Sequence, residues 1–214
     1  MPNIDYANWK KILLDTQTII NFINGKHGLG GAHEAFTARL ITNLSDPARN
    51  AQFYISFVTL SEIHKRVDNN NKMQMIVRAL SGSDVTFVAF DEYPTEFMAA
   101  NYSKYFENKA LNQAAHRFNW QSNNLVDARE WINRDLMIIA SAQGMQLDVI
   151  LTSDVKTMYP LAKEVGAFCA LAYEQCFEVT PNYIHRYHEG EAEQLYEQMR
   201  PGPRDRGTGY GLNA

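Results

Sequence analysis

The chain has 214 residues, of which 45% are hydrophobic and 21% charged, and its formal net charge at pH 7 is −4. This composition is typical of a globular domain and excludes a disordered chain. The acidic balance argues against binding of nucleic acid through a broad basic surface, because that mode needs a surplus of Lys and Arg. It is compatible with a nuclease whose acidic centre is neutralised by divalent ions and whose rim alone is basic.

No run of about 18 consecutive apolar residues occurs, and the first five residues lack the basic-then-apolar order of a signal peptide. We therefore expect a soluble, cytoplasmic protein with no membrane contact. The only cysteines are Cys169 and Cys176. Their number and spacing give neither a disulfide framework nor a C-x-x-C metal motif, so we expect buried, reduced thiols.

The first predicted elements are a strand and a helix that meet at Asp15. The apolar run at residues 11–14 predicts a strand buried on both faces of a sheet. Residues 16–24 space their apolar side chains for one helical face, and Gly25 is expected to end that helix. Asp15 therefore lies at a strand-to-helix junction, where capping of the helix is the alternative to a functional role.

The next segment predicts a helix at residues 32–44 and then a strand at residues 52–58, which are aromatic and β-branched. Another helix follows. Thr59, with Glu62 three positions later, has the form of a capping box at the start of this helix. Glu62 therefore also has a structural alternative to a functional role. A further helical pattern lies at residues 72–80.

A third strand is predicted at residues 85–90, followed by a polar, mostly helical insertion at about residues 91–128. The aromatic side chains of this insertion are suited either to stacking on exposed bases or to packing in the core, and packing is favoured. A long helix at residues 125–143 follows, and Gly144 is expected to end it.

The last elements are a strand at residues 149–152, a helix that Asp154 is placed to cap, and a strand at residues 167–171. Strands that alternate with helices imply right-handed crossovers and a parallel sheet. The predicted fold is an α/β protein, a three-layer α/β/α sandwich with a central parallel sheet of about four or five strands. We expect one domain over residues 1–200 and a C-terminal tail at residues 201–214.

Four acidic residues are candidates for one site. Asp15, Asp154 and nearly Glu62 fall at the carboxyl ends of strands, the edge at which ligands of α/β sheets collect. Asp135 lies where the helix at residues 125–143 begins to bury its apolar face, an unfavourable place for an unpaired carboxylate. Clustered carboxylates raise one another's pKa unless a cation binds between them, and oxygen ligands alone select Mg²⁺ or Mn²⁺.

The motifs that carry these acids resemble the four motifs of PIN-domain nucleases, in the family's order. They are Leu13-Leu14-Asp15-Thr16, Leu60-Ser61-Glu62-Ile63, the run from Asp135 to Ala142, and Leu151-Thr152-Ser153-Asp154. The resemblance covers about residues 11–171 and implies a PIN-like fold. The chain departs from the family at Gln17, where Asn is frequent, and in a stretch between the second and third motifs that is longer than in the smallest members, the VapC toxins.

By this resemblance, the chain is a Mg²⁺- or Mn²⁺-dependent endoribonuclease that hydrolyses RNA phosphodiester bonds. Asp15 and Asp135 would be the principal metal ligands, and Glu62 and Asp154 would bind a second ion or hold waters of the first, so that all four are catalytic. The expected substrate-binding residues are Thr152, Ser153, Lys65, Arg66 and Arg134. The resemblance further implies the toxin of a type II toxin–antitoxin pair, with an antitoxin protein as partner and a homodimeric assembly.

Other interpretations of the same residues have weaker support. A phosphatase of the haloacid-dehalogenase type needs a second aspartate two positions after the first, where this chain has Gln17. Asp127 competes with Asp135 for the third motif but lacks the small-apolar helix that follows Asp135. A housekeeping RNA-processing nuclease and a catalytically silent PIN-like module that binds RNA or protein stay open, as does a solvated-surface role for Lys65, Arg66 and Arg134.

Overall fold

The computed structural model describes residues 9–66, 74, 76, 85–107, 125–180 and 183–186. A parallel sheet of five strands in the order β3-β2-β1-β4-β5 forms the centre of the described chain. The strands are β1 (Lys11–Leu14), β2 (Gln52–Ser56), β3 (Val85–Val88), β4 (Val149–Thr152) and β5 (Cys169–Leu171). The side chains of β4 and β5, and all but the first of β1 and β2, are buried, as expected for strands covered on both faces.

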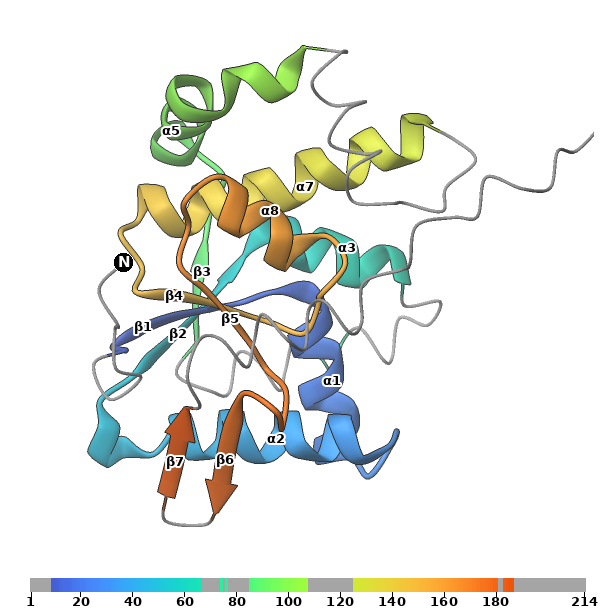
Figure 1. Ribbon diagram of the computed structural model, residues 1–214, viewed down its shortest axis with the longest axis vertical. Coiled ribbons are helices and arrows are strands. Elements are labelled where there is room, and N and C mark those ends of the chain that lie inside the picture. Colours follow the sequence, from blue (N-terminus) through green and yellow to red (C-terminus); the bar gives the residue numbers. More distant parts are fainter. Residues whose placement is uncertain are drawn as a thin grey trace, which may run out of the picture.

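Helices cover both faces of this sheet (Figure 1). The helices are α1 (Thr16–Lys26), α2 (Ala32–Leu44), α3 (Phe57–Arg66), α5 (Glu92–Tyr102), α7 (Leu125–Gly144) and α8 (Met158–Glu164), with 3₁₀ turns η2 (Pro47–Arg49) and η3 (Ser103–Phe106). The pair α1 and α2 lies on one side of the sheet, and α7 and α8 lie on the other, with α5 packed outside α7. The predicted three-layer α/β/α sandwich is confirmed.

The boundary between β2 and α3 differs from the prediction. The predicted strand at residues 52–58 is too long, because β2 ends at Ser56 and the helix begins at once with Phe57. Ser56 Oγ accepts a hydrogen bond from the N–H of Val58 at 3.2 Å, which serves one of the unpaired donors of the first turn. Thr59 thus lies inside α3, so the predicted capping box with Glu62 is wrong, and the capping alternative for Glu62 falls with it.

Gly25 does not end α1, which continues to Lys26. The reason for this glycine is instead the crossing of α1 with α2. A Cβ atom at position 25 would lie 2.8 Å from the Cβ of Ala38 and closer still to the backbone carbonyl of Glu34. The absence of a side chain at Gly25 therefore allows the two helices to approach backbone to backbone.

The sequence patterns did not predict the hairpin of β6 (Phe177–Thr180) and β7 (Tyr183–Arg186), which pairs antiparallel and contacts α2. The ring of Phe177 is buried edge-on against Trp9, with centroids 6.0 Å apart. Residues 74 and 76 are helical, as predicted, while the rest of the helix at residues 72–80 and the tail at 201–214 lie outside the described residues.

The described part of the insertion is helical and packs into the core, as favoured. Tyr102 and Tyr105 are buried, whereas Tyr93 is 70% exposed. Cys169 and Cys176 are buried and are not joined in a disulfide, as predicted. Within the described ranges, no helix combines the length and apolar character that crossing a membrane requires.

The substitution Gly25→Ala is expected to lower the free energy of unfolding by about 1–3 kcal/mol, because its methyl group overpacks the α1–α2 crossing. This loss should appear although alanine is the better helix former. The comparison is Gly31→Ala at the N-cap of α2, where the Cβ would meet only Glu34 Oε2, at 3.7 Å, and where the change costs only the N-cap preference for glycine, about 1 kcal/mol or less. Urea unfolding measures both variants, and equal stabilities for the two would contradict this account of Gly25.

Candidate functional site

The site is built where β1 and β4 end side by side. These strands pair in parallel, with Leu14 beside Leu151. Asp15 follows β1 directly, and its backbone N–H donates to the carbonyl oxygen of Leu151 at 3.2 Å. The strand β4 ends at Thr152, and Asp154 lies two positions later. The predicted placement of both acids at the carboxyl edge of the sheet is confirmed.

Asp15 is a buried carboxylate held by two groups of donors. Its Oδ1 accepts the N–H of Thr18 at 2.7 Å, which makes Asp15 the N-cap of α1, and its Oδ2 accepts the hydroxyl of Thr152 at 2.5 Å. Burial raises the pKa of Asp15 to about 6, the charge of Asp154 adds to the rise, and the bonds from Thr152 and Thr18 oppose it. The capping role of Asp15 is confirmed, and it leaves the carboxylate at the site.

Asp135 lies on α7 and faces the other three acids. Burial raises its pKa well above the ordinary value, and the negative charges of Asp154, Glu62 and Asp15 raise it further, while the nearby side chain of Thr157 opposes the shift. Its Oδ2 is buried and has no hydrogen-bond partner within the described part of the chain. The charges of the other three predicted acids therefore all act on Asp135.

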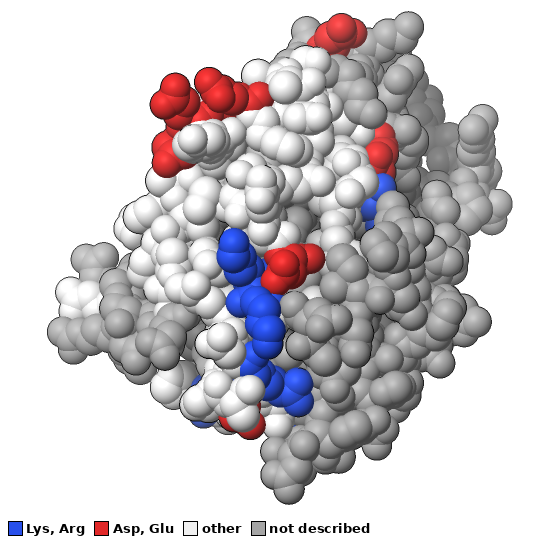
Figure 2. Space-filling view, turned by 90° about the vertical axis from the view of Figure 1, so that its left-hand side faces the viewer, with Lys and Arg blue, Asp and Glu red and all other residues white. Residues whose placement is uncertain are grey.

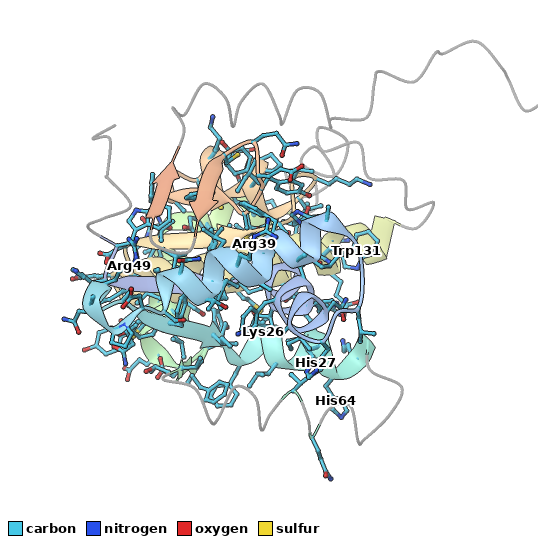
Figure 3. All side chains as sticks on the ribbon, turned by 90° about the horizontal axis from the view of Figure 1, so that it is seen from below. Lys26, His27, Arg39, Arg49, His64 and Trp131 are labelled. Atoms are coloured by element: carbon cyan, nitrogen blue, oxygen red, sulfur yellow. The ribbon has the colours of Figure 1, made fainter. Side chains whose placement is uncertain are left out.

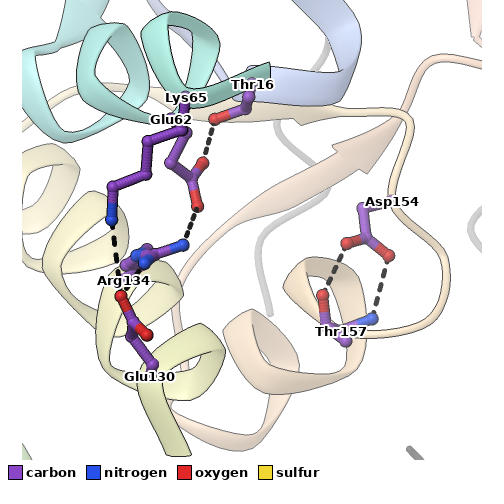
Figure 4. Close-up of polar contacts among 7 residues, drawn as sticks. All are labelled: Thr16, Glu62, Lys65, Glu130, Arg134, Asp154 and Thr157. Atoms are coloured by element: carbon purple, nitrogen blue, oxygen red, sulfur yellow. Dashed lines mark hydrogen bonds and ion pairs between the residues drawn. The ribbon is translucent and has the colours of Figure 1, made fainter. Parts of the chain in front are cut away.

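Glu62 projects from α3 and is engaged by donors of this chain. The hydroxyl of Thr16 donates to its Oε2, and the guanidinium of Arg134 lies 3.9 Å from its Oε1. Arg134 also pairs with Glu130, one turn earlier on α7, and Lys65 lies 3.5 Å from the same Glu130 carboxylate. Figure 4 shows this chain of alternating charges.

Asp154 organises the turn that leads into α8. Its Oδ1 accepts the N–H groups of Lys156 and Thr157 at 2.7 and 2.9 Å, and the hydroxyl of Thr157 donates to its Oδ2. Asp154 therefore stabilises the turn before α8 instead of capping the helix itself, whose N-cap position is Thr157. In Figure 4 this group stands across from the group around Glu62.

A cation fits this donor set by its chemistry. Among the described residues, no three His, Cys, Asp or Glu side chains lie together in an arrangement that holds a metal ion, since Glu62 and Asp154 are turned to their own partners. The Oδ2 of Asp135 nevertheless lacks a hydrogen-bond partner within the described residues, and the negative charges of three further carboxylates act on this side chain. Buried oxygen atoms that repel one another and lack a donor are the groups that a hard divalent cation satisfies.

The predicted substrate-binding residues are divided between the interior and the surface. Thr152 positions Asp15, and the Oγ of buried Ser153 lies 3.2 Å from the Oγ1 of Thr18. Lys65 and Arg134 lie at the acidic site in ion pairs with Glu130 and Glu62. The backbone of Arg66 ends α3, and its side chain lies outside the described residues, as does that of Asp127.

Three residues that contact the site were not predicted. Thr16 and Thr157 bind Glu62 and Asp154. Thr16 directly follows Asp15 at the start of α1, and Thr157 lies three positions after Asp154 at the start of α8, positions that the sequence does show. Tyr173, after β5, donates its hydroxyl to the backbone oxygen of Ser153 at 3.1 Å and stacks on His33 with centroids 4.2 Å apart. Burial and the charges of Asp154 and Asp15 raise the pKa of Tyr173.

Basic side chains do not gather into a broad surface on the face drawn in Figure 2, as far as the described residues show. This face lies on the side where β1 begins, away from the acids, and most of its described Lys and Arg side chains form one narrow band. In Figure 3, Arg49 lies at this end of the molecule, and His27, His64 and Trp131 lie toward the other end. The lack of a broad basic surface among the described residues of this face agrees with the formal net charge of −4.

The substitution Asp15→Asn is expected to stabilise the metal-free protein at neutral pH. Because the pKa of Asp15 is 3.8 in the unfolded chain and about 6 in the folded protein, the folded protein binds more protons between these values. The stability of the unsubstituted protein therefore falls as the pH rises through this window, by about 3 kcal/mol. Asparagine can still cap α1 and removes this loss.

Chemical unfolding at a series of pH values measures the difference between the two proteins, which should be small below pH 3.8 and full above about 6. The control is Asp46→Asn, because Asp46 caps the exposed turn η2 through the N–H of Ala48. A stability difference for Asp15→Asn that does not change with pH would contradict the assignment.

No protein-family model matches the chain, and no curated protein sequence matches it. It is similar to a chain in the crystal structure of VapBC2 from Rickettsia felis bound to a DNA fragment from their promoter, with 14% identity, a TM-score of 0.47, and coverage of 75% of this chain and 98% of that chain. It is also similar to a chain in the crystal structure of DNA-bound VapBC from Salmonella typhimurium, with 17% identity, a TM-score of 0.44, and coverage of 76% and 98%. Likenesses of this size do not by themselves assign a family or a function, so function is inferred from the acidic site.

Proposed function

We propose that the chain is a divalent-metal-dependent endoribonuclease that hydrolyses RNA phosphodiester bonds. The observation that carries this proposal is the buried, unpartnered Oδ2 of Asp135 among the charges of Asp154, Glu62 and Asp15. Such a cluster is unfavourable in the protein alone, because each carboxylate raises the cost of ionising its neighbours. A bound cation removes that cost, and phosphodiester hydrolysis is a reaction that such sites support.

The ion class follows from the donor atoms. The four acids offer only carboxylate oxygens, and His and Cys are absent from the described contacts of the site, so Mg²⁺ or Mn²⁺ is the expected ion. When bound, the ion supplies the Lewis acidity that polarises the scissile phosphate and acidifies the attacking water. Asp15 and Asp135 would be its principal ligands, with Glu62 and Asp154 as further ligands.

The chain's own residues prepare this site. Thr152 and the N–H of Thr18 fix both oxygens of Asp15, so that its orientation is set before any ion binds. Arg134, adjacent in sequence to Asp135, carries guanidinium donors at the site and is suited to binding a phosphate oxygen. Lys65 is more exposed and extends the positive charge to the rim.

The variants Asp15→Asn and Asp135→Asn are each expected to lower kcat/KM for cleavage of single-stranded RNA by at least about 100-fold, since loss of an outer-shell partner alone costs about 10–100-fold. The assay uses end-labelled single-stranded and structured RNA with Mg²⁺ or Mn²⁺. The matched control is Asp91→Asn, an exposed aspartate whose side chain does not cap α5. An equal kcat/KM for the unsubstituted protein and all three variants would contradict the proposed mechanism.

Binding of the ion has a readout that needs no activity. Saturating Mg²⁺ or Mn²⁺ is expected to raise the Tm of the unsubstituted protein, because a ligand that binds only the folded state stabilises it. For a chain of this length, each kcal/mol of stabilisation corresponds to about 2–4 °C. Asp135→Asn should lose most of this shift and Asp91→Asn should keep it. An equal shift in Asp135→Asn would place the ion elsewhere.

We further propose that the enzyme is the toxin of a type II pair, with an antitoxin protein as partner. Support comes from the resemblance of its four motifs to a family that includes the VapC toxins. Induced expression is expected to arrest growth with the unsubstituted chain and not with Asp135→Asn, and co-expression of an adjacent small open reading frame should relieve the arrest. Unchanged growth with an active enzyme would instead favour a housekeeping RNA-processing role.

A further inference from the structure

A cavity of about 460 Å³ opens beside the acidic site. It lies between the start of α3, the segment after β3 and the middle of α7, and its apolar wall includes Phe57, Phe90 and Met137. The size is within the range of about 300–1,000 Å³ that is usual for small-molecule pockets. The acids of the proposed metal site do not explain this apolar wall.

Phe57 is the unusual residue of the cavity. It is 52% exposed, although it is large and apolar and occupies the first position of α3. Its ring packs against that of Phe87 with centroids 5.9 Å apart and planes tilted by 37°, so the remaining ring surface is left for another contact. Isolated exposed apolar side chains are ordinary, but this one forms part of a concave apolar wall.

The polar part of the cavity wall is shared with the acidic site. Glu62 and Arg134 line the cavity, and Glu62 is one of the three acids whose charges act on Asp135. A ligand in the cavity is therefore adjacent to a group bound at the acids. The guanidinium of Arg134 offers donors to the acceptor edge of such a ligand, and its positive charge complements a phosphate that connects the two places.

We propose that this cavity binds one unstacked nucleobase of the RNA strand whose phosphate lies at the acidic site. The inference rests on the proposed nuclease function. An aromatic ring accepts any base by stacking, while Arg134 meets the polar edge that every base presents. A helix of a partner protein would need a continuous apolar groove, whereas the lining of this cavity includes the ion pair of Glu62 and Arg134.

The test compares a 12-nucleotide oligoadenylate with a 12-nucleotide abasic ribose-phosphate strand by fluorescence anisotropy. EDTA is present, so that no strand is cut and repulsion by the carboxylates affects both strands alike. The unsubstituted protein is expected to bind the oligoadenylate more tightly, and Phe57→Ala should shrink this preference by about tenfold, the usual size of one base–aromatic contact. Phe57→Tyr keeps the ring and should keep the preference.

The matched control is Tyr93→Ala, which removes an aromatic side chain that is 70% exposed on α5 and does not line the cavity. This variant should bind both strands as the unsubstituted protein does. Circular dichroism checks that each variant is folded, and the exposure of Phe57 makes misfolding of Phe57→Ala unexpected.

The outcomes separate this inference from the nuclease proposal. Cleavage in Mg²⁺ together with an unchanged base preference in Phe57→Ala overturns the inference and leaves the nuclease standing. A Phe57-dependent preference without cleavage supports base binding and overturns the nuclease. If Phe57→Ala leaves RNA binding unchanged and lowers the sedimentation coefficient from that of a dimer to that of a monomer, a second copy of the chain fills the cavity and the inference is wrong.

Discussion

The carboxylates of Asp15 and Asp135 are buried next to other negative charges, and the arrangement of the site depends on how this repulsion is offset. The negative charge of Asp15 is compensated within the chain, because Thr152 and the start of α1 supply hydrogen-bond donors for both of its oxygens. Asp135 has no such compensation on its Oδ2. The folded protein therefore carries an unfavourable electrostatic term that packing elsewhere must exceed.

The parallel sheet supplies that packing, and it also brings acidic residues together at one edge. Side chains at the centre of β1 and β4 are almost fully buried, which fixes these strands and their register. The same register brings the residues that follow them to one edge, where Asp15 and the turn of Asp154 must meet. The helix α7 then adds Asp135 from the layer above, since its apolar face packs between the sheet and α5. The same packed strands and helix therefore stabilise the fold and bring the acidic residues close to one another.

Local patterns predicted the elements whose boundaries are set by local chemistry. The strands β1 and β4 and the helix α7 were predicted to within a residue because each is a simple apolar run or period bounded by a polar residue or glycine. The limit of β2 was missed because Phe57 and Val58 favour strands by propensity, while the fold uses them to start α3. Gly25 was misassigned because its neighbour, Glu34, is brought to it only by the helix crossing.

The candidate site, like the fold, was predictable from the sequence only in part. The motifs make the four acids candidates, but the partners of these acids depend on contacts distant in sequence, such as Arg134 with Glu62 and Thr152 with Asp15. The β6–β7 hairpin was missed for the same reason, because the burial of Phe177 depends on Trp9 at the other end of the described chain. Side-chain pairing across the fold leaves little trace in a local pattern.

The raised pKa of Asp15 also bears on how such a site persists through mutation. The substitution Asp15→Asn, which is expected to increase stability, is a single-nucleotide change from an aspartate codon, so random mutation supplies it continually. A chain selected only for folding would accept it, because mutations that stabilise are not removed. The aspartate at position 15 is thus expected to cost stability at neutral pH, and a duplicated copy selected only for folding would be expected to lose it early while its fold became more robust.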